Sequence, residues 1–596
     1  MAPPPPREET ERLVQSDEKL NDADSHTLER RNVMWSTCSY ILWLETMEAV
    51  AYYGISQALK NFMEARLGYA KATASAVQST WRSFCDITPL LGAYIGDECW
   101  GRYKSITFFS VWYLAATSLL SFSAHPSVLD QHTSVANGAF LVALFVGVGV
   151  AHGCLNPNIV TIGADQFLPS EESQKQLFFS YFYLAINLGS TVSYGYLAYL
   201  SVDGLGSLIP PSYGYFATFV LSTALMLSAV ALFMAHSSRY VDVPVQADAF
   251  TDLFAKFVRG ARVSTSLRFI VVGFGFFCLS FVLNLIAVFY DSSTVASAAV
   301  TYTAGFCILV GLGCWINKGM DPSYLDNHEI ASILAPVDEL KQVVRVLPFA
   351  SFLVLWQCVF DQIDANFQSI VQQSDLRLGP GRDAPQIPGA MLGLFDTIGV
   401  SLVIPFLEFV VFPKLERARG GVPASPFEKV LTGLLLASFA MLSTGVVESW
   451  RRHAGPIDLG DGLGPILDLG THKPMNAQSW MYMVPNYLLV CFCECLVNVT
   501  MYDVYYSNVP MHWKSTAQAI NSFMLAMGDN MASIFTLTFA PFIPDDLNQG
   551  HLEYMYFCLA CVAFINAVGF GYVMNRMQFA TYHGAPPSPS KYGSIE

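Results

Sequence analysis

Residues 269–290 read FIVVGFGFFCLSFVLNLIAVFY, a continuous apolar stretch without a charged side chain. A helix of about 20 apolar residues is long enough to cross the hydrocarbon core of a bilayer. Similar stretches recur along the chain, for example at 106–124, and short polar connections separate them. Only 13% of the 596 residues are charged, against roughly 25% in soluble domains. The sequence therefore predicts an all-α membrane protein and excludes an ordinary cytosolic enzyme.

The apolar stretches divide the chain into two similar halves. We predict about fourteen spans arranged as six, two and six. The expected spans are 34–59, 75–97, 104–124, 137–162, 176–201, 213–235, 267–290, 296–316, 343–371, 388–413, 427–448, 480–507, 516–541 and 553–575. The predicted parts are a disordered tail at 1–33, a six-helix bundle at 34–235, a linker with two extra spans at 236–342, a second six-helix bundle at 343–576 and a disordered tail at 577–596.

Basic residues in the loops predict the orientation, because Lys and Arg near span ends tend to stay in the cytosol. Placing both termini in the cytosol puts most basic loop residues on that side, among them Arg102, Lys104, Arg239, Lys256, Arg259, Arg262, Arg268, Lys414, Arg417, Arg419 and Lys429. Five basic residues do not fit, namely Lys60, Arg66 and Lys71 on the first outer loop and Arg451 and Arg452 on a later one. The host is either the plasma membrane or an endomembrane.

Charge and cysteine usage exclude several classes of function. The net charge of -15 argues against a nucleic-acid partner, which would require an excess of Lys and Arg. The 13 cysteines lie mostly within apolar stretches and form no CxxC pair beside a histidine pair, so we expect no metal site and no cofactor. An intramembrane enzyme is disfavoured because the sequence contains neither an HExxH motif nor a nucleophile with a neighbouring base.

Ionisable residues inside the predicted spans carry the functional information. Each costs roughly 2.5 to 3.5 kcal/mol at the centre of a membrane helix, so it should face a protein interior or an aqueous cavity. These residues are Glu45, Glu48, Arg82, Asp86, Asp361, Asp364, Asp396, Glu494, Asp503 and Asp529. Those near span ends could instead cap a helix or reach the interface. For Glu45, Glu48, Arg82, Asp86 and Glu494, which lie deeper, we expect a water-lined path.

Helical spacing groups some of these residues. Glu45 and Glu48 are three apart and Tyr52 lies four beyond Glu48, so the three share one stripe of the first helix. Carboxylates in a cavity of low effective dielectric can take up and release protons near neutral pH. The stripe therefore predicts proton-coupled transport. His152 could also titrate in this range, although a hydrogen-bonded structural histidine is the favoured interpretation.

Several motifs resemble those of the proton-coupled oligopeptide transporter family within the major facilitator superfamily. Residues 45–54 read ETMEAVAYYG, similar to the ExxERFxYYG of the family. Residues 88–92, TPLLG, and 101–104, GRYK, are similar to its TPLLGG and LGRY. Residues 182–190, FYLAINLGS, are close to its FYxxINxGS signature. The second half agrees as well, for example at Glu494.

This resemblance implies the major facilitator fold, in which two six-helix bundles enclose a central site that opens alternately to each face. It also implies that the first-span motif takes part in proton coupling and that polar residues of the fifth and tenth spans hold a peptide. The candidate proton-coupling residues are Glu45, Glu48, Arg82, Asp86 and Asp361. The candidate substrate-binding residues are Tyr52, Tyr53, Asn156, Asn187, Asp396, Glu494 and Asn521.

The sequence departs from the family pattern at this site. The Arg of ExxER is Ala49 and the fourth-span Lys is Asn156, so two cations are lost. Asp86 aligns with a family Tyr and Asp396 with a family Asn, so two acids are gained. A family Trp of the eleventh span is Asn521. We therefore expect a more acidic cavity, which disfavours a substrate carboxylate and favours an amino group.

Arg82 is the visible compensation, because it enters the second span where the family has no fixed cation. We expect it to replace the missing Arg as the partner of Glu45 or Glu48, or to receive the carboxylate of the substrate. A private ion pair with Asp86, four residues further along the helix, is the alternative.

The resulting expectation is a monomeric carrier in the lipid bilayer that moves di- or tripeptides or related small solutes together with protons. Two alternatives remain. One is a carrier of the same fold for another small organic solute, an amine or an anion, with altered or absent proton coupling. The other is a membrane sensor that keeps the fold without transporting.

Overall fold

The computed structural model describes residues 33–577 apart from 169–170, 242–244, 246–248, 289–294, 329, 331–333, 335–336 and 508–513. These residues form helices joined by loops, with no strand among the elements they contain. Except for Val33 and Met577, the predicted tails at 1–33 and 577–596 lie outside the described residues.

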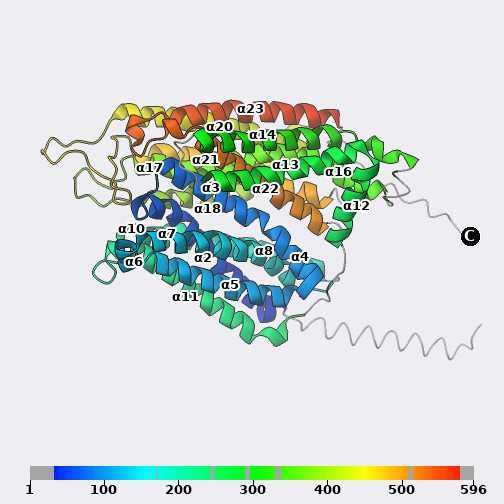
Figure 1. Cartoon of the computed structure of the whole chain (residues 1–596), viewed down its shortest axis with the longest axis horizontal. Helices are drawn as coiled ribbons and strands as arrows, with labels where there is room; N and C mark the ends of the chain where they lie inside the picture. The colour runs from blue at the N-terminus through cyan, green and yellow to red at the C-terminus, as the bar shows by residue number, and fades with distance from the viewer. Residues whose placement is uncertain are drawn as a thin grey trace, which may run out of the picture.

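The first half is built from long helices, several of which contain a π-helical turn. Its main elements are α2 (Ser39–Ala65), α3 (Lys71–Ile87) followed by α4 (Pro89–Tyr94), α5 (Arg102–Ser123), α7 (Thr133–Leu141) followed by η3 (Val142–Gly149) and α8 (Val150–Ala164), α9 (Glu172–Val192) followed by η5 (Ser193–Leu197) and α10 (Ala198–Asp203), and α11 (Gly214–Ala235). Most of them form the lower layer in Figure 1, whereas α3 leans on α22 of the other half.

The second half repeats this design. Its main elements are α16 (Val337–Phe360), η9 (Ile363–Phe367) and α17 (Gln368–Gln372), then α18 (Leu394–Phe406), η11 (Leu407–Val411) and α19 (Phe412–Ala418), then α20 (Pro426–Ala454), α21 (Val484–Ser507), α22 (Lys514–Thr538) and α23 (Leu552–Arg576). Between the halves lie α12 (Ala249–Val263), α13 (Thr265–Val288) and α14 (Val295–Gly319). The pair α13 and α14 packs on the second half, against α16 and α22.

The helices run nearly parallel and give the molecule two ends (Figure 1). The linker end holds α4 and α12, and the loop end holds the segment 455–479, drawn in yellow. Helix α12 was not predicted as an element, because the sequence suggested only a basic connection there. Its Asp252 carboxylate and Lys256 ammonium, one turn apart, form an ion pair of 2.8 Å.

Ten helical segments among the described residues are long and apolar enough to cross a membrane. The other four predicted spans coincide with α2, α3, α9 and α22. Helices α2, α3 and α22 carry many buried polar side chains, because they face protein rather than lipid. The predicted all-helical membrane fold is confirmed, and the total of fourteen spans stays a prediction.

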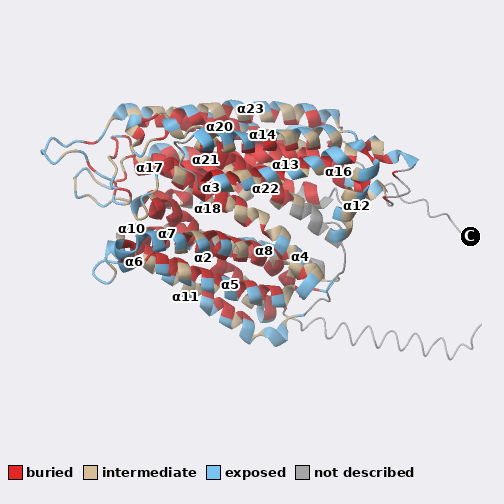
Figure 2. Cartoon of the chain, in the orientation of Figure 1, coloured by how far each residue is buried: buried red, intermediate tan, exposed pale blue. Residues whose placement is uncertain are grey.

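The outer surface of the bundles is apolar. Burial is concentrated where helices face each other, and exposed residues lie on the outward faces (Figure 2). Large apolar side chains such as Leu402, Phe409 and Ile565 are 67%, 81% and 69% exposed on these faces. Such a surface fits contact with lipid, since soluble proteins rarely expose large continuous apolar patches.

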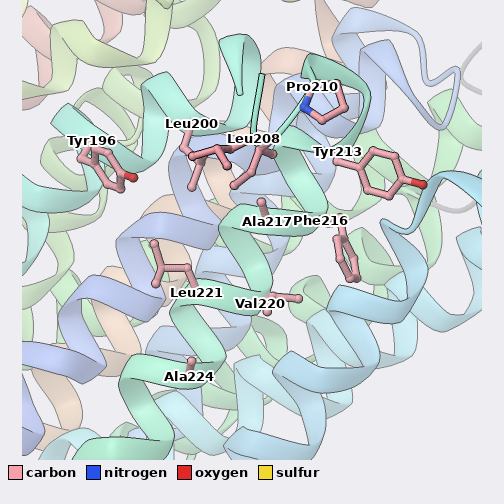
Figure 3. A pocket seen from close by; sticks show the side chains of 11 residues that line it. Tyr196, Leu200, Leu208, Pro210, Tyr213, Phe216, Ala217, Val220, Leu221 and Ala224 are labelled. Carbon is pink, nitrogen blue, oxygen red and sulfur yellow. The ribbon is translucent and has the colours of Figure 1, made fainter. Parts of the chain in front are cut away.

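A hollow of about 530 Å³ opens on this outer surface between α10 and α11, near the loop end. Its walls are apolar, with Leu200, Leu221 and Phe216 on the sides and Tyr196 and Tyr213 at opposite edges (Figure 3). Because it is apolar and carries none of the predicted site residues, we do not take it as the transport site.

A close crossing of α4 and α8 leads to a testable expectation. A Cβ atom added at Gly92 would lie 2.5 Å from the Cα and 2.7 Å from the carbonyl oxygen of Cys154. Backbone atoms cannot rotate away, so Gly92→Ala is expected to lower the unfolding free energy by about 1 to 3 kcal/mol through overpacking. Thermal unfolding of the purified protein in detergent measures the loss.

Gly138→Ala is the matched control, because a Cβ atom at that helical position meets no atom within 4 Å. It should leave the melting temperature unchanged or raise it slightly, since Ala favours helix. Equal melting temperatures for Gly92→Ala and Gly138→Ala would contradict the close crossing.

Candidate functional site

The two acids of the first-span motif lie buried on one side of α2. The Glu48 carboxylate is 2.5 Å from Nδ1 of His152 on α8. The His152 ring stacks on the Tyr52 ring with centroids 3.8 Å apart and an angle of 10° between their planes. Oε2 of Glu45 is buried without a hydrogen-bond partner. The imidazole thus occupies the neighbourhood of the motif, where Ala49 supplies no cation.

The pairings expected for Arg82 with Glu45, with Glu48 or with Asp86 are wrong. Nη1 of Arg82 lies 2.6 Å from Oδ2 of Asp364 and 3.9 Å from Oδ1 of Asp361. The physical reason is that His152 already faces Glu48, whereas Asp364 of η9 and Asp361 just before it lie next to the guanidinium. Arg82 therefore joins the two halves of the molecule.

Further hydrogen bonds hold both acids of this ion pair. Ser79 Oγ donates to Oδ2 of Asp361 over 2.5 Å, and Tyr194 OH donates to Oδ1 of Asp364 over 2.8 Å. Ser79 lies on α3 and Tyr194 on η5, both in the first half. Asp361 lies where α16 meets η9, and Asp364 lies within η9, in the second half. Sequence reasoning had noted Asp364 only as a charge in a span and had not noted Tyr194.

Asp86 has a different neighbour from the one expected. Its carboxyl group interacts electrostatically with that of Asp529 on α22. Gln357 Nε2 donates to Oδ1 of Asp529 over 2.8 Å. This pair of acids is thus a second place where the two halves meet.

Asp396 and Glu494 lie on the neighbouring helices α18 and α21 of the second half, and Glu494 is the strongest charge acting on Asp396. Oδ1 of Asp396 and Oε2 of Glu494 are buried and have no hydrogen-bond partner. Glu494 acts electrostatically on Tyr53 and Tyr183, and Asp396 acts on Tyr487.

The other predicted substrate-binding residues are more dispersed. Asn187 Nδ2 donates to the carbonyl oxygen of Tyr183 on its own helix over 2.9 Å, close to the tyrosines. Asn156 is exposed on α8. Asn521 on α22 is fully buried, and neither end of its amide has a partner. The structure brings neither Asn156 nor Asn521 into a described hydrogen bond with the acids.

The loop end is closed by polar contacts that we call the polar seal, made by Lys60, Asn61, Lys71 and Ser75 of the first half with residues 365–373 of the second. Lys60 Nζ donates to the Ala365 carbonyl oxygen over 2.6 Å and also contacts Ser369 Oγ. Ser75 Oγ donates to the same carbonyl over 2.9 Å. Lys60 is fully buried.

The rest of the polar seal continues toward the surface. Lys71 Nζ donates to Oε1 of Gln373 over 3.0 Å, and Gln372 Nε2 donates to Asn61 Oδ1. The Gln373 carbonyl oxygen also accepts from Arg451 Nη1 over 3.2 Å. These contacts explain why Lys60 and Lys71 stand on an outer loop against the charge rule, because they are buried between the halves.

The remaining exceptions to the charge rule also have local partners. Arg451 is fully buried and forms two bonds of 2.7 and 2.8 Å with the Glu448 carboxylate. Arg452 Nη2 is 2.7 Å from Glu553. Arg66 Nη2 donates to the carbonyl oxygen of Ser212 over 3.2 Å. None of these five cations is a freely solvated loop charge of the kind that sets topology.

Exposure differs between the polar seal and the central residues. The seal residues Lys60, Asn61 and Gln372 are at most 2% exposed. In contrast, Tyr183 is 43% exposed and Arg82, Asp396 and Glu494 are partly exposed. Within the described residues, no group of His, Cys, Asp and Glu side chains is arranged to hold a metal ion.

Comparison with known proteins places these features in context. The family model PTR2, described as the POT family, matches residues 103–543. Over 587 residues the chain is 25% identical to Protein NRT1/PTR FAMILY 8.1 of Arabidopsis thaliana, covering 91% of this chain and 94% of the relative. It is 26% identical over 564 residues to Protein NRT1/PTR FAMILY 7.2 of the same plant, covering 88% and 89%.

Solved structures show the same fold at lower identity. The POT family transporter PepTSo superposes with a TM-score of 0.70 at 21% identity, covering 91% of this chain and 98% of that one. An auto-inhibited POT family peptide transporter gives a TM-score of 0.67 at 19% identity, covering 90% and 96%. These likenesses confirm the predicted major facilitator architecture.

Proposed function

The chain belongs to the POT family of membrane transporters, and on that premise we propose that it carries di- or tripeptides or related small solutes together with protons by alternating access. It is a multi-pass integral membrane transporter and not an enzyme. The observation that carries the proposal is the ion pair of Arg82 with Asp364 and Asp361, because it joins the two halves at their centre.

The closed loop end supports an inward-facing state. We place the linker end in the cytosol, since it carries the basic residues of α12 and of the connection before α5, and we place both termini there as well. Transport then requires the polar seal to open while the linker end closes. Rocking of one bundle against the other about a midplane site is the motion that this architecture allows.

The contact of Asp361 and Asp364 with Arg82 supports proton coupling. While Asp361 and Asp364 are ionised, they attract Arg82 and keep α3 against η9. A proton that binds to Asp361, a candidate proton-coupling residue, weakens this attraction and loosens the contact between the halves. The ring contacts from His152 through Tyr52 and Tyr53 to Tyr194 connect this ion pair with Glu48. The Glu48–His152 contact is thus linked to the ion pair of Arg82 through packed rings.

Uptake of labelled dipeptides into proteoliposomes, with and without an inward pH gradient, tests the proposal. The unmodified protein should accumulate dipeptide only with the gradient. Uptake independent of the gradient would identify a uniporter, and binding without accumulation would support the sensor alternative.

Glu48→Gln should separate coupling from binding. It removes the acid that faces His152 but keeps the shape of the side chain. We expect gradient-driven uptake to fall at least about tenfold, because coupling between two sites typically changes an affinity by about 5- to 150-fold. Exchange of labelled for unlabelled solute should persist. Glu416→Gln, at an exposed position of α19, is the matched control and should change neither rate. Equal loss of uptake and exchange in Glu48→Gln would argue against a coupling role.

A further inference from the structure

We propose that a phospholipid with an ethanolamine headgroup binds at the loop end. One acyl chain lies in the apolar hollow between α10 and α11, and the headgroup lies in a polar cavity beside it. The proposal adds a lipid site to the chain and does not depend on which solute is transported. It needs only that the outward face of α11 contacts the bilayer, and this helix is long and apolar enough to cross it.

The hollow has a surface that matches hydrocarbon. Its volume is about 530 Å³, and Leu200, Phe216 and Leu221 line its sides (Figure 3). Two further lining residues are open to the outside, since Leu208 is 81% and Val220 40% exposed. On the outward face of a membrane span, the neighbour of such side chains is an acyl chain. A chain that enters the hollow gains dispersion contacts on several sides at once.

A polar cavity of about 320 Å³ lies beside the hollow. Both halves of the molecule line it, because Arg66, Asp203 and Tyr215 belong to the first half and His472 belongs to the segment 455–479 of the second. An apolar hollow next to a polar cavity matches an amphiphile better than a fully water-soluble ligand. Pairs of consecutive residues are divided between the two sites, namely Leu200 and Ser201, Pro210 and Pro211, and Ser212 and Tyr213.

Two buried groups that line the polar cavity lack a partner. Tyr215 is 6% exposed, and its hydroxyl has no hydrogen-bond partner among the described residues. The buried Oδ2 of Asp203 has none either. Buried polar atoms in native structures are nearly always hydrogen-bonded. An ionised carboxylate accepts only, whereas a tyrosine hydroxyl can donate. The cavity therefore fits a ligand that offers a donor to the acid and an acceptor to the hydroxyl.

The cavity also carries one charge of each sign. Arg66 Nη2 donates to the Ser212 carbonyl oxygen over 3.2 Å, and the guanidinium has further N–H groups for a ligand. Within the described chain, Arg66 and Asp203 form no ion pair with each other, although both line the cavity. Asp203 ends α10, where the helix carbonyl groups also attract a positive charge. Asp468 of the second half adds to the negative field at Asp203.

A phosphoethanolamine headgroup meets these requirements. Its phosphate is an anion for the Arg66 guanidinium and an acceptor for the Tyr215 hydroxyl. Its primary ammonium brings a positive charge and three donors to the Asp203 carboxylate. A choline headgroup has the same charges but no N–H group, so it cannot donate to Asp203 Oδ2. A glycerol headgroup has no cation and leaves the charge of Asp203 uncompensated.

Lipid binding to the full-length purified protein in detergent tests the proposal. The probes are phosphatidylethanolamine, phosphatidylcholine and phosphatidylglycerol with identical acyl chains, and soluble glycerophosphoethanolamine. Native mass spectrometry measures the lipid retained, and the melting temperature gives a second readout. We expect phosphatidylethanolamine to bind at least about tenfold more tightly than the other two lipids, the factor expected for one lost hydrogen bond to a charged group. The soluble headgroup should not bind measurably.

Two variants test the two parts of the site separately. Asp203→Asn should abolish the preference for phosphatidylethanolamine over phosphatidylcholine. Ala217→Trp, which fills the hollow, should weaken binding of every phospholipid about tenfold. The matched controls are Asp383→Asn, at an exposed loop position, and Leu227→Trp, at an exposed position of α11 outside the hollow. Both should bind as the unmodified protein does. Thermal unfolding shows whether each variant is folded.

Several outcomes would overturn the proposal. Equal binding of phosphatidylethanolamine and phosphatidylcholine, or a preference that persists in Asp203→Asn, would remove the headgroup assignment. Binding of glycerophosphoethanolamine as tight as that of the lipid would show that the hollow contributes nothing. A protein dimer that Ala217→Trp abolishes would assign the hollow to a second copy of the chain. Uptake into proteoliposomes is measured separately, so failure of the lipid site and failure of transport are distinguishable.

Discussion

Replacement of Arg82 by Ala is expected to abolish gradient-driven uptake and to destabilise the protein. The substitution leaves Asp364 and Asp361 without the guanidinium that now lies 2.6 and 3.9 Å away. Removing one partner of a buried ion pair typically lowers the free energy of unfolding by about 3 to 5 kcal/mol, because the remaining charge stays desolvated. The melting temperature and the rate of proteoliposome uptake should therefore both fall. Uptake should fall by about a hundredfold or more, because a loss of about 3 to 5 kcal/mol changes a conformational equilibrium by at least that factor.

The double variant Arg82→Ala with Asp364→Asn separates stability from coupling. It removes one of the orphaned charges, so part of the lost stability should return, whereas uptake should not. Normal uptake in the single variant would show that the ion pair is structural and takes no part in transport.

Lys60→Met is expected to open the loop end. Met keeps the apolar stem of the side chain but cannot donate to the Ala365 carbonyl oxygen or to Ser369. A hydrogen bond from a charged group is worth roughly 1.5 to 3 kcal/mol, so the balance between closed and open loop ends should shift by about ten- to a hundredfold. A large part of the population would then face outward, and uptake would fall because the loop end no longer closes firmly.

Distances between spin labels at Leu208 and Leu378 report this shift. The two positions are exposed, at 81% and 64%, on loop-end segments of opposite halves. The labels are best attached through unnatural amino acids, because the chain has 13 cysteines. Lys414→Met, at an exposed position of the linker end, is the matched control. An unaltered distance distribution in Lys60→Met would mean that Lys60 does not hold the seal.

The fold could be predicted because lipid selects apolar residues over long stretches. Helices that face lipid, such as α13 and α23, stand out by composition alone. Helices α2 and α3 do not, since their buried faces carry polar residues such as Glu48 and Ser79. They were nevertheless predicted as spans, because each contains an apolar stretch bounded by Pro, Gly or charged residues. Helix α12 was missed because it is short and strongly polar on one face.

The partners within the site could not be predicted, because helical spacing reports only neighbours on the same helix. The pattern offered Asp86, four residues from Arg82, whereas the actual partner Asp364 is 282 positions away. In the same way, His152 meets Glu48 across 104 positions. Which faces of α3 and η9 meet depends on the packing of the whole bundle. Among the departures from the family motifs, Asp396 did indicate an acidic centre.

The composition of the polar seal bears on the thermodynamics of the transport cycle. Its contacts are hydrogen bonds from ammonium, amide and hydroxyl groups, with little hydrocarbon between the halves at Lys60, Ser75 and Gln372. When it opens, water can replace each of these bonds, so the net free energy of separation stays modest. Hydration of polar surface lowers the heat capacity, whereas hydration of apolar surface raises it. The heat-capacity change of opening should therefore be small or negative. An apolar closure would weaken on cooling, whereas we expect the polar seal to keep the loop end closed at low temperature.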